Sequence, residues 1–475
     1  MFVVLRHDLT VRTMFDTPGM KAEELQWSST STRQMKPDFR SIRIDTEKCT
    51  GRMKCLRSCP TQALRVRNGK AKLLSDRCID CGECVRVCPN HAFIPQTSSF
   101  SDFSGFKYTI ALPSPVFYSQ FGKDVEPSAI LEALKTVGFD DAYDVACASE
   151  SVSIAIQEYL DTNGTPRPLI SPFCPTIVRL IQVRYPNLLD NLIPIESPME
   201  IAAREAKRAK MHELGLKEHE IGAIYLAPCP SKMIALKNPP RKKHSFLDGV
   251  MPIADIYPNM LRALAHSEHT TGMSEIRGLG LGWPIVGGQV SSLKAEESIA
   301  IAGLADVMRV FDEIENGKLK DIQYIECHSC PTACVGGSLT VENPYIARGR
   351  VLRMVEKYGQ QPCQDRQKIR DLYQKNFFSL VGRIAPSPSQ PLDEDLSRGI
   401  QKMHRRQQTY DILPKIDCGA CGAPSCLTFA EDVVKGNAEA DECVFLAMKS
   451  FESMSTNLLD VVGKHSKKIR SNISS

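Results

Sequence analysis

Strand-like and helix-like segments alternate through the middle of the chain. Apolar runs rich in β-branched and aromatic residues occur at Tyr108–Leu112, Ile221–Leu226 and Ile322–Ile325, and helix-type patterns lie between them. Such alternation is typical of βα units that build a parallel sheet. We therefore expect an α/β domain over residues 99–385.

The flanking segments have other patterns. Residues 41–98 carry only short β-type runs, which predicts a compact α+β module. Residues 1–40 are polar and without clear periodicity, so we expect an irregular lead-in there. The stretch 386–396 is rich in Pro and polar residues and is predicted to be a linker. Residues 397–475 then form a small domain, expected to be mostly helical.

One helix start can be predicted residue by residue. Ser197 has the character of an N-cap, Pro198 suits the first helical position, and Glu200 is placed to complete a capping box. We therefore expect a helix that begins at Pro198.

Composition narrows the classes of function. The 475 residues include 59 basic and 55 acidic side chains, for a net charge of +4, and this near balance speaks against a nucleic-acid partner. No apolar run approaches the ~20 residues of a membrane span. The N-terminus shows no signal-peptide pattern, so we expect a cytoplasmic protein. In a reducing compartment the 18 cysteines stay free, and clustered free thiols usually bind metal.

The segment 41–98 contains the cysteine pattern of bacterial ferredoxins, C-x2-C-x2-C-x3-C-P. It is formed by Cys78, Cys81, Cys84, Cys88 and Pro89. In this pattern three thiolates ligate one cluster and the fourth ligates the neighbouring cluster. Zinc is the alternative ligand, but zinc modules seldom carry the fourth cysteine with its proline. The spacing therefore predicts iron-sulfur clusters.

An upstream copy of the pattern has one substitution. Its remaining members are Cys49, Cys55, Cys59 and Pro60, and Arg52 stands where the second cysteine belongs. Arginine keeps its proton and offers no acceptor, so it cannot ligate iron. The doubled pattern predicts one complete four-iron cluster, on Cys59, Cys78, Cys81 and Cys84. The second site keeps three thiolates and is expected to hold a three-iron or otherwise incomplete cluster, on Cys49, Cys55 and Cys88.

Three further cysteine motifs are spread over the α/β region. They read SPFCP at Ser171–Pro175, APCPSK at Ala227–Lys232 and ECHSCPTACVGG at Glu326–Gly337. Three such motifs in this order resemble those of the iron-only (diiron) hydrogenases, and the resemblance covers residues 42–385. It implies a two-lobed, parallel-sheet hydrogenase-like domain, preceded by a ferredoxin-like module and followed by a small 4Fe-4S domain.

The resemblance also implies the ligands of the active-site cluster. Four thiolates would hold a four-iron cubane, and these are Cys174, Cys229, Cys330 and Cys334. Cys334 would also bridge to a two-iron subcluster carrying carbon monoxide, cyanide and a dithiolate. Lys232 would hydrogen-bond a cyanide ligand, and Gly336 and Gly337 would let the backbone approach the cluster. Cys147 and Cys363 are expected to be structural thiols, and Cys327 and His328 receive no role.

The chain departs from the hydrogenase pattern at positions that bear on turnover. Phe173 stands where the family has a proton-relaying cysteine, and Met199 stands where it tends to have a glutamine. Glu150 and Glu326 are carboxylates at positions that resemble members of the proton path. Fast hydrogen production is therefore not expected, and the altered pocket resembles the sensory branch of the family.

The C-terminal segment carries its own cysteine motif. Its members are Cys418, Cys421, Cys426 and Cys443. The motif looks like the small four-iron domain of electron-transport and corrinoid or carbon-monoxide metabolism proteins, with zinc as the alternative. Pro424 is expected to open a helix that presents Cys426 in its first turn, where the helix dipole favours a thiolate.

Together these motifs predict an enzyme that slowly interconverts dihydrogen with two protons and two electrons. Dihydrogen would split at an open iron, and electrons would leave through the cubane to the other clusters and on to a ferredoxin or another redox protein. One alternative is a sensor of dihydrogen or redox state that signals to a partner protein. Another is an electron-transfer or cluster-assembly protein that lacks the diiron subcluster.

Overall fold

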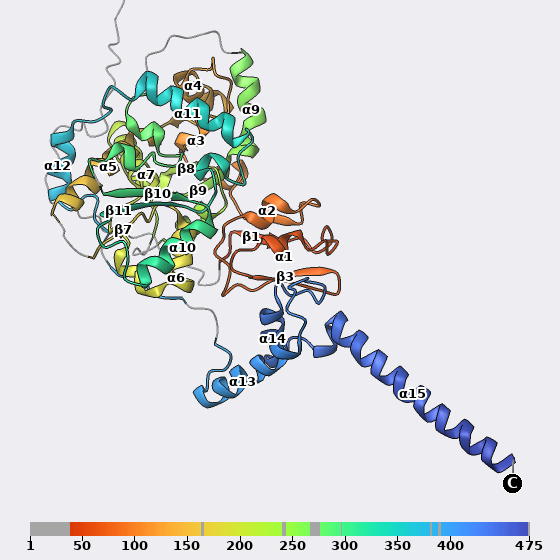
Figure 1. Cartoon of the computed structure of the whole chain (residues 1–475). Helices are drawn as coiled ribbons and strands as arrows, with labels where there is room; N and C mark the ends of the chain where they lie inside the picture. The colour runs from red at the N-terminus through yellow and green to blue at the C-terminus, as the bar shows by residue number, and fades with distance from the viewer. Residues whose placement is uncertain are drawn as a thin grey trace, which may run out of the picture. The chain divides into compact units, whose positions relative to one another are not determined.

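A computed structural model describes most of the chain after its first 38 residues. The described ranges are 39–162, 166–239, 244–266, 276–295, 297–380, 382–387 and 391–473, with side chains up to 462. The predicted lead-in 1–40 lies almost entirely outside these residues, and the predicted linker 386–396 lies partly outside them. Figure 1 labels the helices and strands.

The described residues form two compact units. The larger takes the residues up to Arg43, the stretch Ile79–Gly82 and the residues from Pro95 to 387. The smaller takes Ile44–Cys78, Glu83–Ile94 and the residues from 391 onward. Most of the ferredoxin-like segment, predicted as residues 41–98, and the C-terminal segment, predicted as residues 397–475, thus fall in one compact unit.

Two parallel sheets form the frame of the larger unit. One has the strand order β6 (Asp141–Ala142), β5 (Tyr108–Pro113), β8 (Ile221–Ala227) and β9 (Gly249–Pro252). The other has the order β10 (Ser298–Ala302), β11 (Tyr324–His328) and β7 (Leu169–Ile170). The α/β class with parallel sheets is therefore confirmed, and the strand expected from Ile322 begins two residues later.

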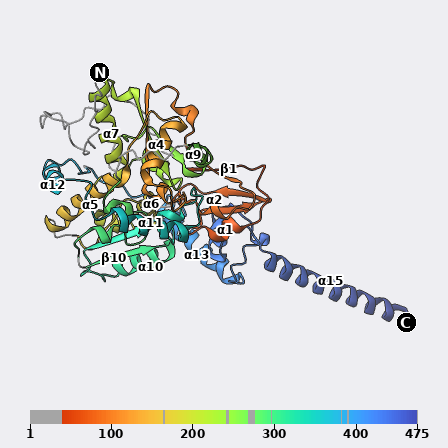
Figure 2. The ribbon, with the colours of Figure 1, turned by 90° about the horizontal axis from the view of Figure 1, so that it is seen from above.

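Helices cover these sheets (Figures 1 and 2). They are α3 (Pro115–Tyr118), α4 (Pro127–Val137), α5 (Val145–Thr162), α6 (Pro175–Arg184), α7 (Pro198–Leu214), α8 (Ser231–Lys237), α9 (Ile253–His266), α10 (Leu304–Glu315), α11 (Pro344–Tyr358) and α12 (Arg366–Gln374). In Figure 2, α10 lies beside β10, its neighbour in the chain.

The core of the larger unit follows the alternation of side chains along its strands. On β5 and β8, Ile110 and Tyr225 point to one face, where they pack with residues of α5 and α7. Ala111 and Ile224 point to the opposite face, where they pack with residues of α4 and α9. Because both faces are covered, all seven residues of β8 are buried, as is usual for parallel sheets. In the second sheet, Ile170 and Ile325 pack with residues of α6 and α10, and the residues of β10 are half-buried.

The start of α7 confirms part of the predicted cap and corrects the rest. The helix begins at Pro198 with Ser197 as N-cap, as expected, but Ser197 makes no side-chain capping hydrogen bond. Glu200 does not complete a capping box, because its carboxylate accepts hydrogen bonds from the Ser245 hydroxyl and from the backbone N–H of Phe246. A tertiary contact therefore takes the carboxylate that the local pattern assigned to the cap.

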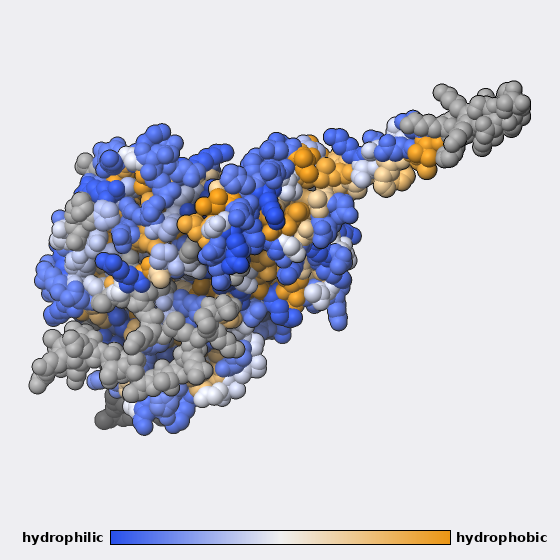
Figure 3. Space-filling view, turned by 90° about the horizontal axis from the view of Figure 1, so that it is seen from below, coloured by the Kyte–Doolittle hydropathy of each residue, from blue (hydrophilic) through white to orange (hydrophobic). Residues whose placement is uncertain are grey.

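The smaller unit combines short strands with helices. Its strands β2 (Leu64–Arg67) and β3 (Lys70–Leu73) pair antiparallel, and β1 (Ile42–Ile44) pairs with β4 (Phe93–Pro95), each of which lies only partly in this unit. Its helices are α1 (Lys54–Ser58), α2 (Glu83–Val87), α13 (Leu396–Ile412), α14 (Cys426–Val434) and α15 (Val444–Ile473). Apolar side chains such as Phe451 and Leu458 are exposed on α15, where Figure 3 shows hydrophobic surface.

No helix within the described residues is long and apolar enough to cross a lipid bilayer.

Candidate active site and cluster-binding cysteines

The three central cysteine motifs meet at the carboxyl ends of parallel strands. Cys174 lies beyond β7, Cys229 follows β8 and Cys330 follows β11. In open α/β sheets this edge is where ligands bind. A cavity of about 80 Å³ lies there, and its lining includes the four predicted ligands Cys174, Cys229, Cys330 and Cys334. The tertiary fold therefore brings together thiols that lie up to 160 positions apart in the sequence.

The environment of these thiols suits a metal cluster. Burial raises the pKa of Cys229 and of Cys334, neighbouring thiols add to the rise, and the charge of Lys232 opposes it. A buried thiol of this kind ionises readily once a metal cation takes the place of its proton. The Ser231 hydroxyl lies 3.1 Å from the sulfur of Cys229 and provides a polar neighbour for that sulfur. The donor set therefore fits an iron-sulfur cluster.

Lys232 lies on α8 and also lines the cavity. Its Nζ donates a hydrogen bond of 2.9 Å to the backbone carbonyl of Phe173, and the side chain is buried. An ammonium group has three donors, so this bond does not exhaust them. The Phe173 carbonyl thus holds the lysine charge at the cavity wall.

One side of the cavity is apolar. Phe173, Met199 and Trp283 all line it, and the ring centroids of Phe173 and Trp283 lie 5.1 Å apart. The indole N–H of Trp283 donates a hydrogen bond of 2.9 Å to the hydroxyl of Ser153, so its proton is already used in that bond. Phe173, which stands at the position of the family's proton-relaying cysteine, therefore forms part of an apolar wall of the cavity.

Glu326, predicted to serve in proton transfer, is fully buried on β11. Its two oxygens accept hydrogen bonds of 3.0 Å from the backbone N–H groups of Gly287, Gln289 and Val290. One of them also lies 2.7 Å from Nε2 of His328. Among the described residues, His328 and Gln289 line the cavity and Glu326 does not. Through these hydrogen bonds, Glu326 fixes the loop that carries Gln289.

Glu150, the other predicted carboxylate, lies on α5 and is absent from the described lining of the cavity. Burial raises its pKa, and it accepts a hydrogen bond of 3.2 Å from the backbone N–H of Cys363. Cys363 is joined to Cys147 in a disulfide, with a Cα–Cα distance of 5.6 Å. The expectation of two structural thiols is thus corrected, because α5 and the segment after α11 bring the two residues within disulfide range.

The two motif glycines have steric reasons to be glycine. A Cβ on Gly337 would collide with the backbone carbonyl of Pro228, and one on Gly336 would collide with the hydroxyl of Thr332. Gly337 also lines the cavity, as the resemblance implied for a residue near the cluster. Gly337 therefore permits a close approach between the loops of the second and third motifs, and Gly336 permits one within the third motif.

Several residues of the cavity were missed in the sequence. Gln289 accepts hydrogen bonds through its side-chain oxygen from the hydroxyls of Ser171 (2.8 Å) and Tyr324 (2.9 Å). His328 was noted beside the third motif but received no role. Gln289 and Trp283 lie outside every motif, so only the fold shows that they line the cavity.

The ferredoxin-like cysteines of the smaller unit also have cluster-like surroundings. Burial, together with the neighbouring thiols of Cys88 and Cys49, raises the pKa of Cys55 to about 11. These three cysteines line a cavity of about 20 Å³, and Arg52 lines it with them. Backbone N–H groups point at two of the sulfurs, from Ala71 to Cys49 at 3.3 Å and from Ala92 to Cys88 at 3.4 Å. Such donors are typical of iron-sulfur sites.

The other ferredoxin-like set is partly gathered within the smaller unit. Burial raises the pKa of Cys84, and the nearby thiols of Cys78 and Cys59 add to the rise. The backbone N–H of Ala63 donates to the sulfur of Cys59 at 3.2 Å. Cys81, the fourth predicted ligand, belongs to the larger unit through the stretch Ile79–Gly82.

The C-terminal cysteines lie around the start of α14. Cys426 is the first residue of this helix and Ser425 is its N-cap, so the expected position of Cys426 in the first turn is confirmed. Pro424 precedes the cap and does not open the helix, which corrects that part of the prediction. Burial raises the pKa of Cys421, and the thiols of Cys443 and Cys418 add to the rise. In the described part of the chain, no three His, Cys, Asp or Glu side chains are gathered as a site for a single ion.

Comparisons with known families agree with these segments. Residues 107–271 match the family of the iron only hydrogenase large subunit, C-terminal domain. Residues 41–89 match the 4Fe-4S dicluster domain, and residues 413–445 match a family of Fe-S cluster domains.

Individual relatives are distant. The chain is 25% identical to iron hydrogenase 1 of Clostridium pasteurianum over 325 residues, which cover 60% of this chain and 54% of that protein. It therefore spans about half the length of this relative. A stretch of 47 residues is 38% identical to the corrinoid/iron-sulfur protein large subunit of Moorella thermoacetica, covering 10% of each chain. A variant of the FeFe-hydrogenase HydA1 from Chlamydomonas reinhardtii superposes with a TM-score of 0.45 at 15% identity, covering 62% of this chain and 97% of that chain.

Proposed function

We propose that this chain, whose central segment matches the iron only hydrogenase family and whose flanking segments match families of Fe-S cluster domains, interconverts dihydrogen with two protons and two electrons at a low rate. The observation that carries the proposal is the cavity lined by Cys174, Cys229, Cys330, Cys334 and Lys232. A cubane linked to a diiron subcluster would supply an open iron for dihydrogen and a store for electrons.

The residues of the chain have separate tasks in this proposal. The four cysteines would hold the cluster. Lys232, held by the Phe173 carbonyl, presents its positive charge to a small anionic ligand such as cyanide. Phe173, Trp283 and Met199 keep water from one side of the cavity, and they also leave that side without a proton donor. Slow turnover follows from this last property.

The stretch Ile79–Gly82 belongs to the larger unit. A Cβ on Gly82 would lie 2.5 Å from the Ser338 hydroxyl and 3.1 Å from the Pro230 ring, so this stretch packs tightly against the loops of the second and third motifs. Cys81 is the neighbour of Gly82 in that stretch. In this proposal, electrons of the active-site cubane would pass to the ferredoxin-like cluster that has Cys81 among its expected ligands. A ferredoxin or another small redox protein would serve as the external partner.

Infrared spectroscopy of the matured protein tests the proposal. Bands of metal-bound carbon monoxide and cyanide, together with measurable hydrogen turnover with methyl viologen, are the expected result. Cys334→Ala should lose the bands. Cys327→Ala is the matched control, because Cys327 is a buried cysteine of β11 outside the described cavity lining. A matured protein without these bands is instead an electron-transfer or cluster-assembly protein.

The apolar wall at Phe173 favours a second candidate function, a sensor of dihydrogen or redox state. A sensor requires a cavity that binds dihydrogen but has no need of fast proton delivery. The expected distinction is a full set of infrared bands that respond to hydrogen while turnover stays negligible.

A further inference from the structure

Strand β2 of the ferredoxin-like segment touches the C-terminal cysteine loop. The backbone N–H of Val66 donates a hydrogen bond of 2.8 Å to the carbonyl of Gly422, the residue after Cys421. Val66 also lines the small cavity of Cys49, Cys55 and Cys88. One residue of β2 therefore contacts the surroundings of two proposed cluster sites.

A buried ion pair fixes this contact in register. Arg65 donates to both carboxylate oxygens of Asp432 on α14, from Nε at 2.6 Å and from Nη2 at 3.1 Å. Arg67 adds a third bond to the same carboxylate at 3.0 Å. Arg65 and Asp432 are both buried. A buried carboxylate that accepts two hydrogen bonds from a planar guanidinium allows one orientation of α14 against β2, because other orientations would leave a buried charge unpaired.

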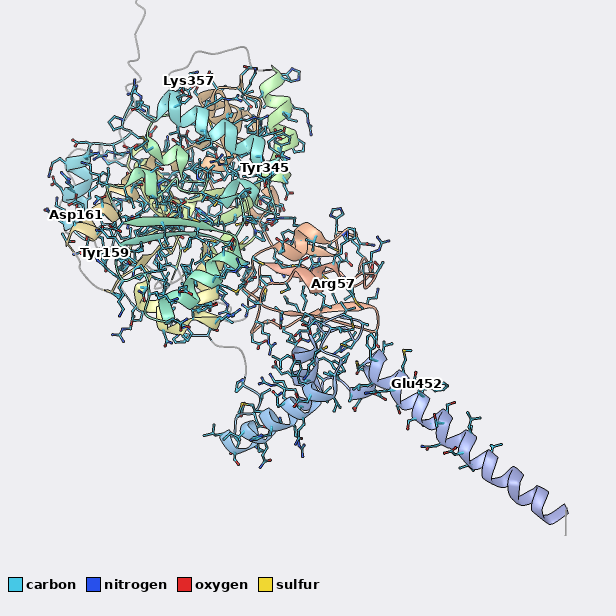
Figure 4. All side chains as sticks on the ribbon, in the orientation of Figure 1. Arg57, Tyr159, Asp161, Tyr345, Lys357 and Glu452 are labelled. Carbon is cyan, nitrogen blue, oxygen red and sulfur yellow. A yellow bond between two sulfur atoms is a disulfide. The ribbon has the colours of Figure 1, made fainter. Side chains whose placement is uncertain are left out.

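Two arginines of the ferredoxin-like segment also bind the backbone of the C-terminal cysteines. Arg67 donates to the carbonyl of Cys421. Arg57, which is labelled in Figure 4, donates to the carbonyl of Cys418 at 3.1 Å. The loop that carries the first C-terminal thiols is thus attached directly to the ferredoxin-like segment, and the covalent linker is not its sole connection.

We propose that the C-terminal cluster is an internal electron partner of the cluster held by Cys49, Cys55 and Cys88, and that the two exchange one electron across the Val66–Gly422 contact. The inference rests on the proposed function for the identity of the clusters. In each exchange one cluster is oxidised and the other is reduced by a single electron, and no proton or covalent bond is transferred. An external low-potential one-electron donor, such as a reduced ferredoxin, supplies the electron.

Gly422 offers a specific way to break the contact. Its φ is +76°, and an added Cβ would collide with the carbonyl of Val66. Gly436 lies in the same segment with a φ of +72°, and a Cβ there would meet nothing within 4 Å. Gly422→Ala and Gly436→Ala therefore share the backbone strain of a residue in the left-handed region. Only Gly422→Ala disturbs the contact between Val66 and residue 422.

The test compares these two variants with the unmodified full-length chain after reduction by dithionite. Paramagnetic resonance should show spin–spin coupling between the two clusters in the unmodified chain and in Gly436→Ala. In Gly422→Ala we expect the coupling to vanish with iron content unchanged, and hydrogen exchange of the Val66 amide to accelerate about tenfold or more. Should Gly422→Ala fail to fold, Asp432→Asn, which keeps the side-chain shape but removes its charge, is expected to weaken the same coupling.

The outcomes separate this inference from the proposed function. Coupling that persists in Gly422→Ala or, where that variant does not fold, in Asp432→Asn overturns the inference, as does an unmodified chain that holds both clusters without coupling. If replacing Cys421 and Cys426 by serine removes no iron, the C-terminal segment holds no cluster. That result contradicts the proposed cofactor set itself.

Discussion

Phe173 acts on the cavity through two different groups. Its backbone carbonyl accepts the hydrogen bond of Lys232, and its ring packs against Trp283 on the apolar wall. A change of the side chain therefore leaves the lysine contact in place. This separation makes Phe173 a suitable position to test whether proton delivery limits turnover.

We predict that Phe173→Cys increases hydrogen turnover by at least about tenfold. A thiol places an exchangeable proton at the cavity, and positioned proton donors commonly contribute ~10²-fold or more. The measurement is hydrogen production with reduced methyl viologen on protein that shows the infrared bands. Phe173→Ala serves as control, since it opens the same space without a proton. Equal rates for the two variants at every pH would mean that the missing relay is not the bottleneck.

Arg52 stands at the wall of the three-cysteine cavity. It follows Gly51, whose φ is +70°, and precedes Met53, whose φ is +59°. The guanidinium is permanently charged and carries only donors, so it offers no ligand to iron. We therefore propose that Cys49, Cys55 and Cys88 hold a three-iron cluster.

The corresponding prediction is a paramagnetic signal near a g value of about 2.01 in the oxidised protein, as a three-iron cluster gives and an oxidised four-iron cluster does not. Arg52→Cys should lose this signal and gain about one iron per chain. Lys54→Cys is the control, because Lys54 lines the same cavity outside the motif position. A signal that is absent from the unmodified protein, with iron matching complete cubanes, would show that another group completes the site.

At the scale of elements, β11 positions the loop 287–290 through a single side chain. Three backbone N–H groups of that loop converge on the carboxylate of Glu326, and the loop supplies Gln289 to the cavity. Charge-assisted hydrogen bonds to a buried carboxylate are among the stronger ones in proteins. The loop therefore depends on β11 for its conformation.

We predict that Glu326→Gln destabilises the larger unit by about 2 to 4 kcal/mol. An amide NH₂ would face backbone donors, so at least one buried N–H would lose its acceptor. Thermal unfolding under anaerobic conditions measures the effect. Glu313→Gln, which removes an exposed ion pair with Lys318, should change stability by less than about 1 kcal/mol. If the two variants unfold alike, the loop is held by other contacts.

At the scale of the whole chain, the C-terminal segment is part of the smaller unit. Removing it would take away the carboxylate that pairs with Arg65, so the smaller unit would lose a buried ion pair. Among the described residues, none of that segment lines the cavity of the larger unit. Loss of the segment should therefore affect the ferredoxin-like part more than the active site.

We predict that a chain ending after residue 395 keeps the infrared bands of the active site and loses about four irons. Its ferredoxin-like clusters should also degrade faster on warming, because β2 has lost its partner. A chain ending after residue 462 retains Cys443 and should keep all of its iron. Loss of the infrared bands from the shorter chain would show instead that the segment is needed for folding of the larger unit.

The sequence by itself determined the α/β class, the start of α7 and the identity of the candidate cluster ligands. These features are encoded locally, because short spacings aim neighbouring sulfurs at one point and because proline and serine define a helix start within a few residues. The Cys-Pro and Pro-Cys motifs even indicated that four distant thiols belong to one site. They did so through resemblance, since local spacing alone cannot join Cys174 to Cys334.

Only the tertiary structure decided which groups surround those thiols. Glu326 accepts hydrogen bonds from a loop some forty positions earlier in the chain, and Glu200 accepts one from the backbone N–H of Phe246. Cys147 forms a disulfide with Cys363. Arg65 and Asp432 meet across 367 positions and connect the ferredoxin-like segment to the C-terminal segment. Such contacts arise from packing between distant elements, and each partner alone looks like an ordinary polar residue, so the chain carries no local signal of them.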